Sequence, residues 1–336
     1  MNREKLFTFI LLFIGGAFLG LNSAHGQYDL DYGGMIGASN YLGEIGGTKR
    51  VGKGTPRKNF VADLRLDQTK FAVGGWIRYK VHPLVSVKAG LSWIRIGAED
   101  ATSDYIARRV RNLSFRNDIY EFNVQGEYNF YEIHNIAPRG RTVVDFGTYA
   151  LLGGGMFYHN PKAEFNGKWW ALQPLHTEGQ GIDGVTTTDK NGNVIPLAEY
   201  KRFQAQVSGG LGFYYTFKRK WRIGWELGVR MTFTDYLDDI STRYVDPALL
   251  DDGTPTGAAA AALSDNTNLD LAAKNGITVS TTGGSVRGNP EQNDWYMFTA
   301  VTIGYVVKGK GNFYKQKYKL LTGKTKRKKR KTRAKF

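Results

Sequence analysis

Residues 119 to 131 alternate strictly between two kinds of side chain. The even positions carry Tyr, Phe, Val, Gly, Tyr and Phe, whereas the odd positions after Ile119 carry only Glu, Asn and Gln until Tyr131. Strict alternation predicts a β-strand, but a soluble sandwich rarely makes one face so aromatic and the other so polar. The same split recurs in residues 85–93, 203–217 and 221–233. The pattern therefore favours strands that contact lipid on one face.

Strands in lipid must close into a barrel, because an open sheet leaves edge groups without hydrogen bonds. Each of the expected strands exceeds the roughly 9–11 residues that cross a bilayer at a tilt. Aromatic residues at strand ends fit the girdles of such barrels at the membrane interfaces: Trp221, Phe233, Trp295 and Tyr305. The eight expected strands are residues 28–42, 69–81, 84–97, 115–131, 142–158, 200–217, 220–235 and 294–307.

The connections between these strands alternate in length. The long ones are residues 43–68, 98–114, 159–199 and 236–293, and the short ones are 82–83, 132–141 and 218–220. Long loops outside and short turns in the periplasm are typical of outer-membrane barrels. We therefore expect an all-β, eight-stranded antiparallel transmembrane barrel over residues 27–307, in the outer membrane of a Gram-negative-type cell. Its C-terminus is expected in the periplasm.

The inward positions of this barrel carry both signs of charge. An eight-stranded barrel is only wide enough inside for its own side chains, and an unpaired buried ion is costly. We therefore predict a lumen closed by ion pairs, without a conducting pore. The residues concerned are Arg78, Lys80, Lys88, Glu121, Glu127, Arg222, Glu226 and Arg230.

Residues 1–26 are expected to form a secretory signal peptide. Residues 2–5 are polar with two cations, residues 6–21 are apolar apart from Thr8, and Ala24-His25-Gly26 is a small-x-small triplet. A single amphipathic anchor helix is the alternative.

The positive charge of the chain belongs to its last segment. Residues 308–336 hold 14 Lys and Arg and no acid, which accounts for most of the formal net charge of +16. The body is nearly neutral, so we expect no nucleic-acid partner. Such blocks are disordered and often serve as interaction arms; a merely solvated extension is the alternative. The expected partner-binding residues are Lys324, Lys326, Arg327, Lys328, Lys329, Arg330, Lys331, Arg333 and Lys335.

Residues for catalysis and cofactor binding are sparse. The chain has no cysteine, which excludes thiol chemistry and Cys-based metal sites, and no metalloprotease, nucleophile-elbow or phosphate-loop motif is present. His159 or His176, with nearby Glu178, could in principle form the catalytic group of a hydrolase at the outer rim. A histidine in a surface loop is usually only solvated, and that interpretation is favoured. We expect no enzyme activity, cofactor, bound metal or small-molecule substrate.

The loops carry further signals. The carboxylates at Asp235, Asp238 and Asp239 could hold calcium, but they lack the order of a known calcium loop, so pairing with Arg243 or another loop cation is favoured. Residues 258–262 are all alanine and, with Gly283-Gly284, suggest a mobile outer loop. Residues 188–193 predict a hairpin turn.

Several strings resemble the PorG family of type IX secretion-system outer-membrane barrels. They cover residues 27 to about 307 in order. The strings are residues 39–44 (SNYLGE), 111–117 (RNLSFRN) with 126–130 (GEYNF), 160–163 (NPKA) with Trp170, 172–175 (LQPL) and 177–181 (TEGQG), and 233–241 (FTDYLDDIS) with Tyr244.

The resemblance implies a small barrel without enzymatic activity. Relatives associate with the periplasmic ring of the secretion machine, built from a lipoprotein and its partner, so these and outer-membrane lipid are the partners implied. The long basic tail and the longer last loop depart from the family pattern.

Topology adds an expectation about two of these strings. The first and seventh strands both neighbour the eighth in a closed meander. The string at residues 40–43 and the string at residues 235–238 should therefore meet at the outer rim, below the loop around Pro174. There they would order the long loops into a folded cap. The rim residues concerned are Asn40, Tyr41, Leu42, Gly43, Asp235, Tyr236, Leu237, Asp238 and Asp239.

Two functions remain open. The chain is either a non-catalytic part of a type IX-like secretion machine, organising a periplasmic ring through its turns and tail, or an independent barrel of the OmpA/OmpX kind. The second would act in adhesion or envelope stability through its outer loops.

Overall fold

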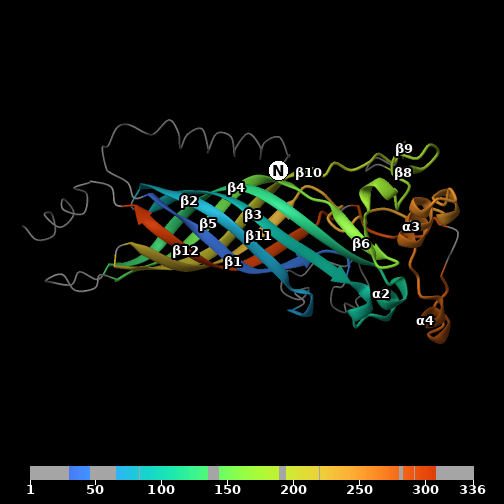
Figure 1. The fold of residues 1–336 in the computed structure, drawn as a ribbon, viewed down its shortest axis with the longest axis horizontal. Helices are drawn as coiled ribbons and strands as arrows, with labels where there is room; N and C mark the ends of the chain where they lie inside the picture. Colours follow the sequence, from blue (N-terminus) through green and yellow to red (C-terminus); the bar gives the residue numbers. More distant parts are fainter. Residues whose placement is uncertain are drawn as a thin grey trace, which may run out of the picture. The chain divides into compact units, whose positions relative to one another are not determined.

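The computed structural model contains a closed antiparallel barrel of eight strands (Figure 1). The structure describes residues 30–45, 66–82, 84–134, 144–188, 194–218, 220–279, 283–290 and 292–307. The barrel strands are β1 (Leu30–Leu42), β2 (Lys70–His82), β3 (Val85–Glu99), β4 (Ser114–His134), β5 (Val144–Tyr158), β10 (Phe203–Phe217), β11 (Trp221–Thr232) and β12 (Trp295–Val307).

Each strand pairs with its neighbour in the chain, and β1 pairs with β12 to close the ring. The predicted eight-stranded barrel is therefore confirmed, with small shifts at the strand ends. β11 ends at Thr232 instead of continuing to residue 235. The Thr232 hydroxyl lies within hydrogen-bonding distance of the carbonyl oxygens of Thr234 and Asp294, where the chain leaves the ladder.

The two faces of the barrel differ as the alternation requires. On β4, Tyr120 and Phe122 are exposed, at 58% and 50%, whereas Glu121 between them is 2% exposed. Trp221 and Phe233 are also exposed, and the rings of Trp221 and Tyr305 meet edge to face with centroids 5.5 Å apart. An exposed apolar belt around a polar interior is the arrangement of outer-membrane-type barrels.

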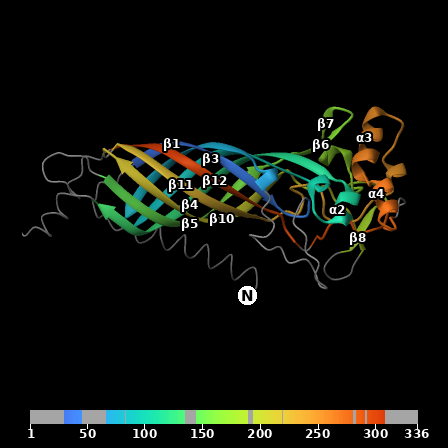
Figure 2. The ribbon, with the colours of Figure 1, turned by 90° about the horizontal axis from the view of Figure 1, so that it is seen from below.

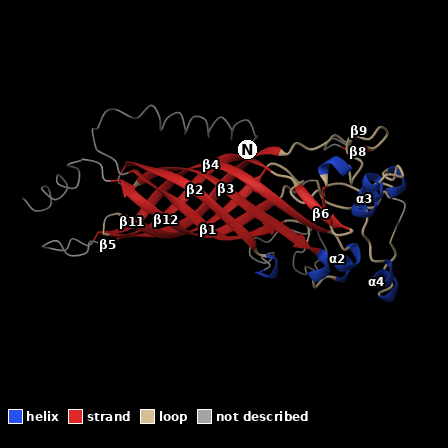
Figure 3. Ribbon diagram, in the orientation of Figure 1, coloured by secondary structure: helices blue, strands red, loops and turns tan. Residues whose placement is uncertain are grey.

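The longer connections fold into additional elements at one end of the barrel (Figures 2 and 3). We call this end the cap end, and we call residues 39–45, 99–118, 159–202 and 233–294, as far as they are described, the cap. Its helices are α2 (Ile106–Arg111), α3 (Pro255–Ser264) and α4 (Leu269–Lys274), and its hairpins are β6 (Pro161–Phe165) with β7 (Lys168–Ala171) and β8 (Thr186–Thr188) with β9 (Val194–Pro196). Short 3-10 turns lie at Leu66–Gln68, Asp100–Thr102, Gln173–Leu175 and Pro247–Leu249.

Two expectations about the loops have different outcomes. Strands β8 and β9 pair on either side of the predicted hairpin turn, whose residues 189–193 lie outside the described residues. The alanine run, expected in a mobile outer loop, instead forms part of α3, whereas no observation tests the mobility of the loop. The side chain of Thr254 caps α3 by accepting a hydrogen bond from Gly257 N, and Ala259 and Ala260 are buried.

One apolar core continues from the barrel into the cap. It joins strand residues such as Ile94 and Phe298 to cap residues such as Leu175, Leu237 and Ile240. The cap is thus packed on the barrel by the same hydrophobic burial that stabilises a soluble core. Among the described residues, no helix has the length and hydrophobicity needed to cross a membrane.

Candidate functional site

Inward-facing charges meet in the barrel lumen. Away from the cap end, Arg78 Nη1 lies 3.3 Å from Asp31 Oδ2, and Arg78 Nη2 donates to Glu127 Oε1 at 3.1 Å. Arg222 Nη1 reaches the same Asp31 oxygen at 2.7 Å. Lys80 pairs with Glu132 at 3.0 Å. Each carboxylate here balances a cation from another strand.

Closer to the cap, the charges are joined by tyrosines. Lys88 Nζ lies 2.6 Å from Glu226 Oε2, which also accepts from the Tyr149 hydroxyl at 2.9 Å. Arg230 Nε lies 3.1 Å from Glu121, whose Oε2 accepts from Tyr296 at 2.5 Å. These hydrogen bonds offset part of the cost of removing the ions from water.

Side chains leave little space between these pairs. A cavity lined by Trp76, Lys88, Glu121, Glu226 and Arg230, among others, has a volume of about 20 Å³, enough for roughly one water molecule. All eight charged residues that the sequence places in the lumen take part in ion pairs. Their partners are one another, Asp31 or Glu132.

The sequence reasoning missed some partners in the lumen. Asp31 has the inward parity of β1 and could have been found from the alternation. Tyr149 and Tyr296 also point inward, but an aromatic residue at an inward position carries no polarity signal that reveals its role.

The two rim strings meet at Tyr41. Its hydroxyl oxygen lies 2.6 Å from Asp238 Oδ2 and 2.8 Å from Asp294 Oδ1, and it accepts from Glu44 N at 3.2 Å. A phenol has one proton, so both short contacts are hydrogen bonds only if one of the two carboxyl groups is protonated. Burial raises the pKa of Asp238, and the charges of Asp294 and Glu44 raise it further.

The remaining rim residues lie near this contact and are mostly buried. A Cβ at Gly43 would lie 1.8 Å from the Tyr41 hydroxyl oxygen, so only glycine fits there. Asn40 donates to Thr69 Oγ1 at 3.1 Å, and Leu42 and Asp235 are buried. Leu237 is fully buried, and its carbonyl accepts from Asn117 Nδ2 at 2.7 Å.

Asp239 ties the loop beyond Pro174 to the rim. Its carboxyl group accepts hydrogen bonds from the hydroxyls of Thr177 and Tyr200, the latter at 2.6 Å. Tyr200 in turn stacks on Tyr236, with ring centroids 4.5 Å apart. Burial raises the pKa of Asp239 to about 6, although the Arg287 charge and these hydrogen bonds act in the opposite direction.

Glu178 binds backbone amides. Its oxygens accept from Ser241 N at 2.8 Å and from Thr242 N at 3.0 Å, and Arg287 Nη1 lies 3.2 Å away. Arg287 also donates to Asp239 O at 2.8 Å. The cation of this cluster is therefore Arg287, not Arg243, whose Nη1 donates to Gly284 O instead.

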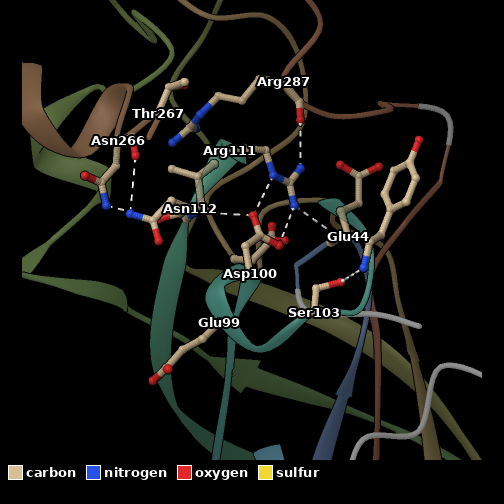
Figure 4. Close-up of polar contacts among 12 residues, drawn as sticks. Glu44, Glu99, Asp100, Ser103, Arg111, Asn112, Asn266, Thr267 and Arg287 are labelled. Atoms are coloured by element: carbon tan, nitrogen blue, oxygen red, sulfur yellow. Dashed lines mark hydrogen bonds and ion pairs between the residues drawn. The ribbon is translucent and has the colours of Figure 1, made fainter. Parts of the chain in front are cut away.

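Arg111 connects three further segments of the cap (Figure 4). It binds Asp100 through two hydrogen bonds, at 2.7 and 3.0 Å, and donates to the carbonyl oxygens of Glu44 and Arg287 at 3.0 and 3.3 Å. The next residue, Asn112, ends α2 in the left-handed conformation, with φ 55°, which asparagine tolerates better than most residues. Arg111 thus fixes α2 against the segment that follows β1 and the loop that precedes β12.

The histidines considered for catalysis have structural surroundings. His159 is fully buried at the end of β5, and burial lowers its pKa to about 4. His176 Nδ1 lies 3.8 Å from Glu199, and Glu178 is occupied by the amides and by Arg287. Among the described residues, no group of three or more potential ligands is placed to hold a metal ion. The signal-peptide residues 1–26 and the basic tail, with all nine cations from Lys324 to Lys335, lie outside the described residues.

A family model described as a domain of unknown function, DUF6089, matches residues 4–149. No curated protein matches. Among solved structures, Ail, the attachment invasion locus protein of Yersinia pestis, is similar in a complex with the heparin analogue sucrose octasulfate, at 10% identity and a TM-score of 0.29, covering 84% of this chain and 99% of that chain. Ail alone gives 9% identity and a TM-score of 0.28, with the same coverage.

Proposed function

We propose that the chain is a non-catalytic outer-membrane barrel of a type IX-like secretion machine, organising a periplasmic ring through its turns and basic tail. One observation carries the proposal. The strings that resemble the PorG family are far apart in the sequence, yet they converge in the cap through Tyr41–Asp238, Asn117–Leu237, Thr177–Asp239 and Arg111–Glu44 contacts. Their convergence supports reading them as one structural unit, as expected of a family signature.

The exposed apolar belt supports the location. Outward side chains such as Leu152 and Leu211, at 68% and 55% exposure, would be costly in water over so many strands. In lipid they are stabilising. The cap then faces outward, and the short turns face the periplasm.

The closed lumen supports an anchoring role. Paired charges fill the interior, so the barrel offers no route for a secreted protein or for ions. A barrel of this kind contributes its two ends, which are the cap and the turns with the tail. We assign the tail to acidic surfaces of the periplasmic ring proteins, because cations near an acidic partner strengthen binding and speed encounter.

Deletion of residues 308–336 tests the assignment. We expect the ring lipoprotein and its partner to be lost from cross-linked complexes isolated from native envelopes, as measured by mass spectrometry, together with a loss of secretion. A second variant keeps the length of the tail and replaces its nine cations from Lys324 to Lys335 by glutamine, and it should lose the ring proteins as well. If both variants keep the ring proteins and secrete normally, the proposal is wrong.

A second function is favoured by a specific observation, the apolar side chains that the cap exposes. Leu249, Leu269 and Val286 are 64%, 53% and 67% exposed, which suits a surface that binds a partner outside the cell. The chain would then act in adhesion or envelope stability. If this second function is correct, replacing these three residues by serine abolishes surface binding while secretion continues. The secretion proposal does not expect surface binding to be lost while secretion is kept.

A further inference from the structure

A row of aromatic side chains crosses three neighbouring strands at the cap end of the apolar belt. Tyr120 on β4 is paired in register with Tyr158 on β5, and Tyr158 is paired with Phe203 on β10. All three are exposed on the outer face of the barrel. Aromatic rows of this kind mark the boundary between hydrocarbon and headgroups.

Four cations lie immediately beyond this row, and we call them the cationic face. Arg116 and Lys162 are paired in register between β4 and β6, and Arg116 has the same outward parity as Tyr120. Lys201 and Arg202 directly precede Phe203, and Arg202 Nη1 lies 3.3 Å from the Tyr158 hydroxyl. The cations therefore begin where the aromatic row ends.

The cationic face differs from the lumen in its charge balance. Every lumen cation described above has a carboxylate partner, whereas within the described part of the chain none of the four cations is in an ion pair. Among the nearby acids, Asp118 is held by Arg95 at 2.7 Å, Glu199 accepts from Gln173 Nε2 at 3.1 Å, and Glu164 is exposed on β6. A net positive charge remains.

Arg116 is held in place while keeping an unused donor. Its guanidinium carbon lies 3.9 Å from the ring centroid of Trp169 on β7, a cation–π contact that fixes the plane of the group. Its Nε is buried and has no hydrogen-bond partner among the described residues. A planar guanidinium matches the geometry of a phosphate better than an ammonium group does.

We propose that the cationic face binds the phosphate groups of an anionic glycolipid in the outer leaflet. Because the cations continue directly from the apolar belt, a molecule with acyl chains below and phosphate above contacts both surfaces together, which a soluble anion cannot do. Basic residues near an anionic membrane surface strengthen binding to its headgroups. The inference rests on the proposed membrane location, but not on a role in secretion.

The test measures binding of phosphorylated lipid A and of its dephosphorylated form to the full-length protein in neutral detergent micelles. Arg116→Gln with Lys162→Gln is the main variant. Lys162→Gln with Lys201→Gln is the second, since both side chains lie on the surface and the Arg116–Trp169 contact stays intact. The matched control, Lys218→Gln with Lys220→Gln, removes two cations at the opposite end of the barrel. Heat-dependent gel migration verifies folding of each variant.

We expect the unmodified protein to prefer the phosphorylated form, and both face variants to lose affinity about tenfold or more, while the control binds normally. Equal binding of the two lipid forms would overturn the proposal, as would an equal loss in the control or unchanged binding in both face variants. Full competition by millimolar inorganic phosphate would also overturn it, because the site would then recognise a soluble anion. None of these results depends on whether the ring proteins bind.

Discussion

At the scale of single residues, the Tyr41 hydroxyl lies between the buried carboxyl groups of Asp238 and Asp294. Tyr41→Phe removes this group without changing the shape of the ring, which keeps its edge-to-face contact with Phe115. One buried carboxylate then loses its donor and the protonated carboxyl group loses its acceptor, at a cost of about 1–3 kcal/mol. We expect faster amide hydrogen exchange in residues 234–245, measured by mass spectrometry in micelles. Tyr120→Phe, on the exposed outer face, is the control and should leave this exchange unchanged; equal exchange in both variants would contradict the role assigned to Tyr41.

Two buried groups of the cap respond to pH in opposite directions. The pKa of Asp239 is raised to about 6 in the folded cap, so its contribution to stability is complete below its ordinary value and is lost as the pH rises through 6. Asp238 acts in the same direction. The pKa of His159 is lowered to about 4, so its contribution is present above its ordinary value and is lost as the pH falls. Each pKa unit corresponds to about 1.4 kcal/mol.

The variants should therefore change the effect of acid in opposite ways. When the pH falls from 7 to 5, Asp239 adds to the stability of the cap and His159 reduces it. Asp239→Asn removes the first effect, and His159→Gln removes the second. Amide exchange of residues 177–182, corrected for the intrinsic effect of pH, should show the greatest gain in protection on acidification for His159→Gln and the smallest for Asp239→Asn, with the unmodified protein between them. The reverse order would show that these groups do not govern the response.

At the scale of elements, the strands are joined across the lumen by ion pairs such as Arg230–Glu121, which connects β11 to β4. Breaking a buried pair leaves one uncompensated charge, at about 3–5 kcal/mol, whereas replacing both partners by apolar residues is often neutral. We expect Arg230→Met to lower the unfolding midpoint in urea, and Arg230→Met with Glu121→Leu to recover most of the loss. If the double variant lost as much stability as Arg230→Met and Glu121→Leu together lose as single variants, the two residues would not stabilise each other as a pair.

The strands and the inward charges could be predicted from the sequence, because a period of two assigns each side chain to a face. The contacts of the cap could be predicted only where topology brought two strand ends together, as at Tyr41 and Asp238. Glu178 with Ser241, and Arg111 with Glu44, join loops that have no periodicity. The helix α3 was missed because its small side chains show no apolar stripe, and only the buried Ala259 and Ala260 reveal its packing.

At the scale of the whole molecule, the barrel has an apolar exterior and an interior filled by its own side chains, with room for roughly one water molecule. The chain contains no cysteine, so single cysteines can be introduced and spin-labelled without background. Strand β4 suits this approach because its outward residues are exposed and its inward residues are buried along the ladder.

The decisive measurement is the accessibility of nitroxide labels at each position from 119 to 130, in the full-length protein reconstituted in lipid bilayers. Labels at even positions should collide with dissolved oxygen and be shielded from a water-soluble nickel chelate, and labels at odd positions should be shielded from both. A water-accessible lumen would expose the odd positions to the chelate, and a soluble protein would expose the even ones. Either result, or accessibility without a period of two, would contradict the closed and filled membrane barrel.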